Sequence, residues 1–255
     1  MSFIKRLIIH QKRLTKLIFC ILLDFKLLSI SILTIYNYFF FIFFLNRKIE
    51  KKYRSKKEKF KNYCNQKLRF NHKDLFSNNI PSWLYIFYKF SLLNKKINVL
   101  EIGSYEGRSS FFLVKNLKKI KLTCVDTFKP FHELQGNYPS KFSQIYKNFK
   151  FNTKKFKNRV KTKKQKSKYF FYENKKKFSL IYIDGSHEYK DVLHDSIAAF
   201  KICNKNGIII FDDFFWENKK TSTSPVFAIL KFLSQKRNNI KILYVNYQII
   251  IQKIN

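Results

Sequence analysis

The stretch Ile97-Asn-Val-Leu-Glu-Ile-Gly103-Ser-Tyr-Glu-Gly107 decides the fold of this 255-residue chain. An apolar run ends in an acid and a glycine, a second glycine follows four residues later, and the next residues have the pattern of a helix start. This order indicates a buried parallel strand, a tight turn and a helix N-terminus. Glycine suits the turn because the backbone bends sharply and lies against a ligand without a Cβ in the way. Open α/β sheets bind nucleotides in such a crevice.

The glycine spacing argues against a dinucleotide as the ligand. A dinucleotide fingerprint has three glycines, G-x-G-x-x-G, whereas this turn has only Gly103 and Gly107. The carboxylate of Glu101 would repel a pyrophosphate and attract a ligand with an ammonium group. An ordinary Rossmann-like turn without a ligand is the alternative. The motif resembles the first motif of class I S-adenosylmethionine-dependent methyltransferases. The resemblance implies that the turn, with Ser104 and Ser109, packs against the cofactor and that Glu101 lies near its amino group.

Two later positions complete the expected cofactor site. Lys121 to Asp126 has the pattern of a second strand that ends in an acid. An acid near this place bonds the ribose hydroxyls in nucleotide-binding α/β units, whereas a capping or solvent-facing Asp is the alternative. Residues 160–166 are predicted as the third strand, and the resemblance places Ser167, just past it, beside the adenine.

The strongest signal is a pair of apolar runs that end in carboxylates. One is F-S-L-I-Y-I-D-G-S-H, from Phe178 to His187, and the other is I-I-I-F-D-D, which ends at Asp213. Two such strands lie close together in a parallel sheet, so Asp184, Asp212 and Asp213 should gather at one edge. Three crowded carboxylates repel one another unless a proton or a cation intervenes, and a hard divalent ion such as Mg²⁺ suits them. A capped turn without a metal is the alternative.

The pattern I-D-G-S-H-x-Y followed by I-I-x-D-D resembles the metal-dependent O-methyltransferase branch, including methyltransferase family 24, over about residues 80–253. The resemblance implies two cofactors, S-adenosylmethionine and Mg²⁺ or a similar divalent cation. The metal, held by Asp184 and its neighbours, would lower the pKa of a substrate hydroxyl. His187 is the candidate base because imidazole titrates near neutral pH. Sugar-modifying relatives can carry an acid where this chain has Ser186, and that acid is a different candidate for the base. For His187, the alternative is a residue at the helix start that only packs or caps.

The predicted fold is α/β: a Rossmann-like, mostly parallel seven-stranded sheet with helices on both faces and an antiparallel last strand. Apolar stripes predict helices after Pro81 and over 192–200 and 225–236, and the last two strands are expected at 241–244 and 248–252. We assign residues 61–255 to the methyltransferase domain. The loop 127–140, which holds His132, is the expected specificity region.

The first 60 residues have the pattern of a membrane attachment. Apolar residues recur at helical spacing between basic ones up to Leu22, which predicts a basic amphipathic helix. Residues 27–45 then run without a charge and are long enough to cross a bilayer core. A charged linker, helical or loose, follows. The Lys/Arg excess after the apolar run, and the cytosolic origin of S-adenosylmethionine, predict a cytoplasmic catalytic domain. A monotopic segment that dips in and returns is the alternative.

The charge balance points to anionic partners. The chain holds 52 Lys+Arg against 16 Asp+Glu, a net charge of +36, which suits a membrane surface, a nucleic acid or an acidic glycan. A bias toward A/T-rich codons is the simpler explanation of the average composition, and the 30 Phe and one Met fit it. The four cysteines form no C-x-x-C pair, which favours a reduced compartment over a zinc site or a disulfide frame.

Three functions follow from these patterns. The first is a membrane-attached O-methyltransferase that acts on a hydroxyl of a small molecule or a glycan. The second is a nucleic-acid-binding protein or an RNA methyltransferase, because the stretch from Lys147 to Lys177 is strongly basic. A solvated helix face is the more usual reason for such a stretch, and an aromatic stacking motif is not evident. The third is a non-catalytic scaffold that keeps the cofactor fold.

Overall fold

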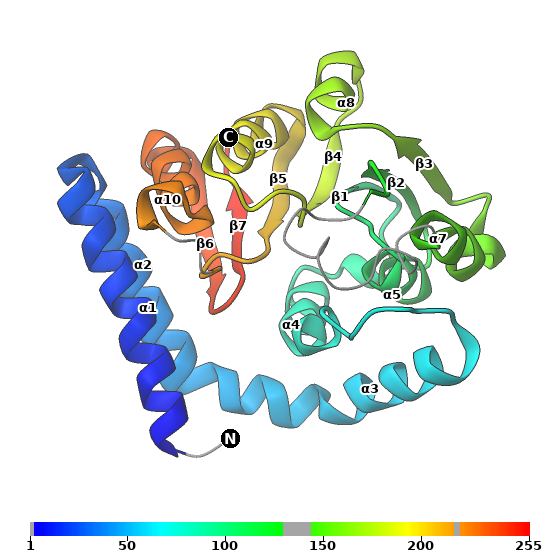
Figure 1. The fold of residues 1–255 in the computed structure, drawn as a ribbon, viewed down its shortest axis with the longest axis horizontal. Helices are drawn as coiled ribbons and strands as arrows, with labels where there is room; N and C mark the ends of the chain where they lie inside the picture. The colour runs from blue at the N-terminus through cyan, green and yellow to red at the C-terminus, as the bar shows by residue number, and fades with distance from the viewer. Residues whose placement is uncertain (1–2, 130–143, 217–219) are drawn as a thin grey trace.

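A seven-stranded sheet forms the centre of the computed structural model, which describes residues 3–129, 144–216 and 220–255. The strand order is β3-β2-β1-β4-β5-β7-β6 (Figure 1). Neighbours from β3 to β5 pair in parallel, and β7 is antiparallel to both β5 and β6. The predicted fold, with its antiparallel last strand, is confirmed. The strands are β1 (Ile97–Ile102), β2 (Ile120–Asp126), β3 (Val160–Lys164), β4 (Phe178–Ile183), β5 (Cys203–Phe211), β6 (Ile240–Val245) and β7 (Ile249–Lys253).

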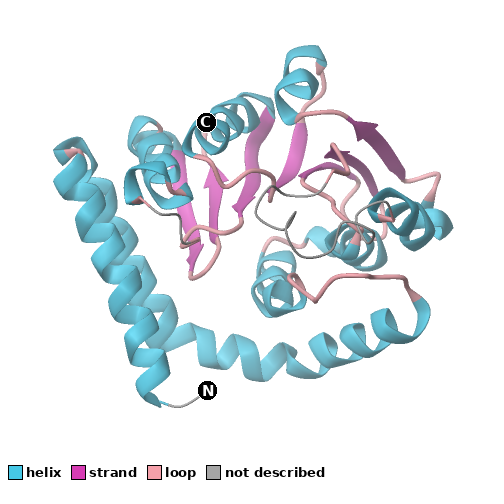
Figure 2. Cartoon of the chain, viewed as in Figure 1, coloured by secondary structure: helices cyan, strands magenta, loops and turns pink. Residues whose placement is uncertain are grey.

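Helices cover both faces of the sheet (Figure 2). Successive strand residues point to opposite faces, so Val99 joins one hydrophobic core while Leu100 joins the other. The central strands are apolar on both sides for this reason. One face carries α4 (Ile80–Lys89), α5 (Arg108–Asn116) and α7 (Ile145–Thr153), and the other carries α8 (Ser167–Glu173), α9 (Tyr189–Ile202) and α10 (Pro225–Gln235). Short 3₁₀ turns are η3 (Ser77–Asn79), η4 (Leu92–Asn94), η6 (Lys154–Phe156), η7 (Thr221–Thr223) and η8 (Arg237–Asn239).

The N-terminal residues form a helical hairpin and a long helix against this core. The hairpin consists of α1 (Phe3–Leu23), the turn η1 (Phe25–Leu27) and α2 (Leu28–Phe40), and it lies beside α10 and β6 (Figure 1). A π-helical turn, η2 (Phe41–Leu45), leads into α3 (Asn46–Lys67), which packs on α4. Within the described residues one helical stretch, Phe25–Lys67, is long and apolar enough to cross a membrane.

The structure can be compared with the expectations for the N-terminal region and for the specificity loop. The charged segment after residue 45 is helical, one of the two forms expected. The domain boundary expected after residue 60 falls inside α3, where Tyr53, Phe60 and Cys64 are buried in the same core as α4 and α5. The apolar stretch 27–45 is partly covered by protein, because Leu27, Ile30 and Tyr38 pack against α10 and its neighbours. Most of the expected specificity loop, including His132, lies outside the described residues.

Candidate active site

Three neighbouring strands end at one edge of the sheet and place acids there. The backbone ladder continues one residue beyond the strands: the Asp184 N–H donates to the carbonyl of Ile102 at 2.8 Å, and the Asp212 N–H donates to the carbonyl of Ile183 at 2.9 Å. Asp184 and Asp212 are therefore held as neighbours by main-chain bonds. This carboxyl edge is where open α/β sheets bind ligands.

The glycine turn after β1 has the strained backbone that its sequence predicts. Gly103 has φ +85° and Gly107 has φ +83°, a region that side chains disfavour. A Cβ on Gly103 would lie 1.7 Å from the carbonyl oxygen of Asp184. Gly107 is the N-cap of α5, and a Cβ there would lie 3.0 Å from the ring of Phe149. The turn thus depends on glycine because the end of β4 closes directly over it.

Glu101 lies beneath the turn in a shell of small polar groups. Its Oε2 accepts hydrogen bonds from the hydroxyls of Ser104, at 2.9 Å, and Ser110. Burial raises the pKa of the Glu101 carboxyl, and the serine hydroxyls oppose that rise. The Oε1 atom is buried and has no hydrogen-bond partner among the described residues. The hydrogen bonds from Ser104 and Ser110 are thus both crowded onto Oε2.

A cavity of about 620 Å³ opens over the turn and the strand ends. This volume lies in the usual range for a small-molecule site. Eight of the residues predicted for cofactor binding, metal binding or catalysis line this one cavity: Gly103, Ser104, Ser109, Asp126, Asp184, His187, Asp212 and Asp213. The two halves of the predicted site, which are far apart in sequence, therefore face the same space.

Asp126, at the end of β2, supports the turn and faces the cavity. Its Oδ2 accepts a hydrogen bond from the N–H of Tyr105 at 2.7 Å, and its Oδ1 accepts one from the N–H of Phe128. Burial raises the pKa of the Asp126 carboxyl, and the backbone donors lower it in part. Each carboxylate oxygen has a second lone pair, so Asp126 can hold the turn and still accept a hydroxyl proton from a ligand.

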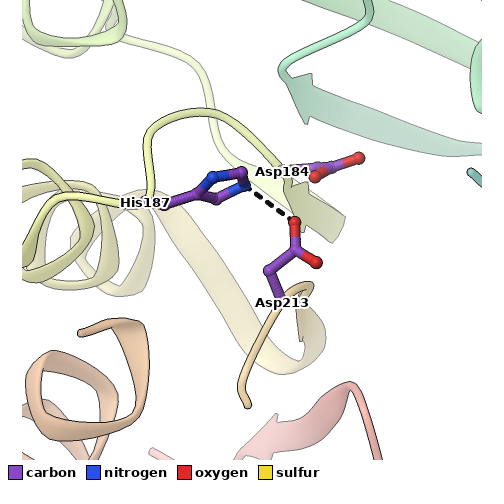
Figure 3. A group of neighbouring side chains, drawn as sticks. All are labelled: Asp184, His187 and Asp213. Atoms are coloured by element: carbon purple, nitrogen blue, oxygen red, sulfur yellow. Dashed lines mark hydrogen bonds and ion pairs between the residues drawn. The ribbon is translucent and has the colours of Figure 1, made fainter. Parts of the chain in front are cut away.

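The acidic cluster divides into two kinds of carboxylate. Single ligand atoms of Asp184, His187 and Asp213 lie within 4.8 Å of one another (Figure 3). Asp212 is held differently, because its Oδ2 accepts hydrogen bonds from Gln248 at 2.8 Å and Asn79 at 3.1 Å. The hydroxyl of Tyr182 lies within hydrogen-bond distance of both Asp184 and Asp212 and shares its one hydrogen between them. Neutral donors therefore stabilise Asp212, whereas Asp184 and Asp213 face the imidazole.

Burial and mutual repulsion disfavour the charged form of these acids. Burial, and then the charges of Asp212 and Asp213, raise the pKa of Asp184 well above its usual value. The pKa of Asp212 rises to about 7, mainly through burial and then through the charge of Asp213. A positive charge between them would remove this penalty.

His187 is oriented on two sides. Its Nε2 lies 2.9 Å from Oδ2 of Asp213 (Figure 3), and its ring stacks on Trp216 with 4.2 Å between the ring centroids. A carboxylate and an aromatic plane fix the imidazole at the cavity wall. This is the environment of a residue that can exchange protons with a bound ligand.

Residues 100–214, which contain the turn, the acids and His187, match a family model described as a methyltransferase domain. The match covers a little under half of the chain, and this segment is similar to the methyltransferase domains of that family. The chain's seven-stranded sheet with an antiparallel last strand is the Rossmann-like methyltransferase fold that the sequence motifs predict.

One curated protein is similar to this chain in sequence, and several solved structures are similar to it in fold. An uncharacterized protein of Acanthamoeba polyphaga mimivirus is 31% identical over 127 residues, 46% of this chain and 52% of the relative, so the chain spans about half the length of that relative. MycE methyltransferase of the mycinamycin biosynthetic pathway, solved with Mg, S-adenosylhomocysteine and mycinamycin VI, has a TM-score of 0.54 and 17% identity over 78% of this chain and 54% of its own. Cofactor-bound Rv0187 from MTB has a TM-score of 0.50 and 11% identity over 86% and 95%. These two structures share the fold.

Three predicted site residues of the methyltransferase domain do not line the cavity. Glu101 and Gly107 lie beneath the turn. Ser167 opens α8, and its hydroxyl donates to Asp195 at 2.8 Å. The contact of Glu101 with the cofactor amino group and the place of Ser167 beside the adenine therefore stay predictions.

The opposite wall of the cavity was not predicted. Residues 70–76, between α3 and α4, line it, and Glu106 ties this segment to the glycine turn. The Glu106 carboxylate accepts hydrogen bonds from the backbone N–H groups of Asn71 and His72 and from the side chain of Asn148. The position of Glu106 between the two motif glycines is a sequence feature that could have indicated these hydrogen bonds. Trp216 and Tyr247 line the cavity near His187 and were also missed.

Proposed function

We propose that this chain is an S-adenosylmethionine-dependent O-methyltransferase, assisted by a divalent cation, that methylates a hydroxyl of a small molecule or a glycan. One observation carries the proposal: a single cavity joins the glycine turn and Asp126 to Asp184, His187 and Asp213. A methyl donor at the turn would thus lie beside the groups that can activate an acceptor. Placing two reactants in such a pocket supplies much of the rate enhancement of a transfer reaction.

The donor half of the cavity suits a nucleoside with a cationic amino acid tail. Asp126 can accept the ribose hydroxyls, and Ser104 and Ser109 line the space above the turn. The unpartnered Oε1 of Glu101 fits an ammonium group that approaches from the turn. Glu101 and Gly103 thus support the methionine end, as the resemblance implies.

The acceptor half fits a hard cation. Asp184 and Asp213 offer carboxylate oxygens, and the crowding of acids that raises the pKa of Asp184 is relieved by a bound positive charge. We propose Asp184, Asp212 and Asp213 as ligands, with His187 beside them and outside the ligand set. When bound, such an ion polarises an acceptor hydroxyl and lowers its pKa.

His187 is the proposed base. The acceptor hydroxyl would give its proton to Nδ1, because Nε2 carries its own hydrogen toward Oδ2 of Asp213. Asp213 stabilises the imidazolium that forms, because an opposite charge at this distance favours the charged ring. Trp216 keeps the ring from rotating away. The deprotonated oxygen then attacks the methyl group of the donor, and the sulfur leaves as a neutral thioether.

The charge of the cavity favours a neutral acceptor over a nucleic acid. Its lining includes five carboxylates, from Glu106, Asp126, Asp184, Asp212 and Asp213, against one lysine and one arginine. The arginine, Arg108, already lies 3.5 Å from Asp74 and stacks over Phe70. Such a lining repels a phosphodiester backbone. A nucleic-acid partner stays an untested alternative that salt-dependent filter binding would reveal.

We also propose that the N-terminal segment attaches the protein to a membrane, with the catalytic domain on the cytoplasmic side. The apolar helical stretch Phe25–Lys67 and the basic residues around it support this location. The methyl donor is made in the cytosol, which agrees with that side. An acceptor that is a lipid-linked or cell-surface glycan would then meet the enzyme at the membrane.

Calorimetry with S-adenosylmethionine tests the donor half. The full-length protein should bind it, and Asp126→Asn should weaken binding by about tenfold, because a ribose hydroxyl loses a charged acceptor. Ser167→Ala, measured in parallel, tests the predicted adenine contact. The proposed function fails if the wild-type protein releases no heat when S-adenosylmethionine is added and if S-adenosylhomocysteine does not compete for the site.

A further inference from the structure

The hairpin of α1 and α2 has an exposed apolar face. Of the nineteen large apolar side chains that are exposed in the described residues, fourteen lie between Ile4 and Phe44. Leu22 is 75% exposed, Phe43 is 70% exposed and Phe25 is 75% exposed. Apolar exposure concentrated in one part of the chain is typical of an interaction site.

The other face of the hairpin is fastened to the catalytic domain by polar contacts. The Arg13 guanidinium donates to Oδ1 of Asn246 at 2.6 Å, and Lys16 donates to the carbonyl of Trp216 at 3.0 Å. At the hairpin turn, Lys231 of α10 forms an ion pair with Asp24 at 2.7 Å. These contacts and the buried Leu17 and Cys20 hold α1 along the domain (Figure 1).

This attachment is incompatible with a hairpin that crosses a bilayer. A hairpin that crosses the bilayer would be surrounded by lipid, whereas Tyr38 of α2 packs on Phe215 of the catalytic domain, with 5.5 Å between the ring centroids. If the hairpin crossed the bilayer, Asp24 at its turn would separate from Lys231 of α10. The unpaired charge would have to pass through hydrocarbon, which is costly. We propose that the hairpin is monotopic: its outer face is embedded in one leaflet of an anionic bilayer, and its axis lies parallel to the membrane. This deepens the membrane attachment proposed above and does not depend on methyl transfer.

Charge favours an anionic lipid surface over a second copy of this chain. Residues 1–61 carry fifteen Lys/Arg and three acids, and the whole chain has a net charge of +36. Two copies joined through the hairpin would bring these charges together and repel each other. Exposed Lys5, Lys12 and Lys26 on the hairpin instead suit anionic headgroups around an inserted apolar face.

Vesicle sedimentation tests the lipid surface. The full-length protein should bind vesicles that contain phosphatidylglycerol, and Leu22→Asp with Phe43→Asp should weaken that binding by at least about tenfold, because two apolar anchors become charged. Tyr172→Asp is the matched control, since Tyr172 on α8 is 93% exposed and far from the hairpin in sequence. Equal losses in both variants, or dimerisation through this face without vesicle binding, would overturn the proposal.

Cysteine labelling tests the monotopic arrangement. The four native cysteines are buried, so Lys26→Cys and Lys52→Cys each add one exposed thiol. In a monotopic protein both thiols react with a membrane-impermeant maleimide from the side of the catalytic domain. A spanning hairpin, or a single span over 27–45, protects residue 26 from that side, and this result would refute the arrangement.

A separate set of contacts links α1 to the catalytic base. Lys16 donates to the carbonyls of Phe215 and Trp216, at 3.2 and 3.0 Å, and the Trp216 ring stacks on His187. The Arg13 guanidinium lies 5.2 Å from the ring centroid of Phe215. From these contacts we infer that Lys16 is a positioning residue that holds Trp216, and through it His187. Of the two measurements that test this inference, only kcat rests on the proposed function.

Lys16→Met should lower kcat by about tenfold and leave KM for S-adenosylmethionine within about twofold, because a small misplacement of the base slows transfer without changing donor binding. Lys16→Arg, which keeps the donors, should restore most of the rate. Lys12→Met is the control on the exposed side of α1. Trp216 should also become more accessible to acrylamide in Lys16→Met, while the fully buried Trp83 stays protected.

The fluorescence measurement separates the two proposals. If the wild-type protein transfers no methyl group, the proposed function fails, yet acrylamide quenching still reports whether Lys16 holds Trp216. Quenching and kcat in Lys16→Met that equal those of Lys12→Met would refute the positioning role.

Discussion

Asp184→Asn should lower the rate of methyl transfer by roughly a thousandfold or more while S-adenosylmethionine binds with nearly unchanged affinity. Asparagine has the same shape, and the main-chain bond from residue 184 to Ile102 is kept. The variant loses the negative charge that would hold a cation beside His187 and Asp213. Donor binding is spared because the turn and Asp126 lie in the other half of the cavity. Methyl-transfer assays with added Mg²⁺ and calorimetry with the donor measure the two effects.

The stability of this variant separates catalysis from folding. Burial and the charges of Asp212 and Asp213 disfavour a charged Asp184, so neutral asparagine removes a repulsion, and Tm should not fall. Asp191→Asn, an exposed acid on α9, is the matched control and should keep full activity. A rate for Asp184→Asn within threefold of the wild-type rate would refute the metal-assisted mechanism.

Gly103→Ala should destabilise the domain by more than about 2 kcal/mol and abolish donor binding. The new Cβ would lie 1.7 Å from the carbonyl oxygen of Asp184, and φ at this position is +85°. Relief of the clash has to separate the end of β1 from the end of β4. That movement displaces both the glycine turn and the first acid of the site. Urea unfolding and calorimetry measure the two losses.

Gly185→Ala is the matched control for this prediction. Gly185 lies next to Asp184 on the same strand end, but a Cβ there would meet side chains, Ile102 at 3.3 Å and Asp195 at 4.0 Å, and no backbone atom within that distance. Its cost should stay below about 1 kcal/mol, with donor binding retained. Equal destabilisation by the two substitutions would show that the backbone of Gly103 has no special role.

Local patterns predicted the sheet and most of the catalytic edge. Strands buried on both faces are continuous apolar runs, and each run here ends in a glycine or an acid. Parallel pairing then brings these ends to one edge, so Asp184, Asp212 and Asp213 could be placed together from the sequence. The helices followed from apolar stripes of period 3.6 in the same way.

Contacts between distant segments could not be predicted in this way. Glu106 binds residues 71 and 72, and Lys16 reaches carbonyls about two hundred positions later in the chain. Nothing in the local pattern of either partner specifies the other. The same reason explains why Trp216 and Tyr247 were missed as neighbours of His187.

Residue patterns alone were enough to predict the α/β class and the strands that end in acids, and to identify the methyltransferase motifs. These features depend on residue periodicity and on neighbours along the chain. Tertiary packing decided that Asp184 and Asp213 lie near His187 and that Asp212 is bonded to Gln248 and Asn79. It also decided that one side of the apolar N-terminal helix is covered by protein. Periodicity shows that a side chain will be buried, but only packing determines the partner against which it is buried.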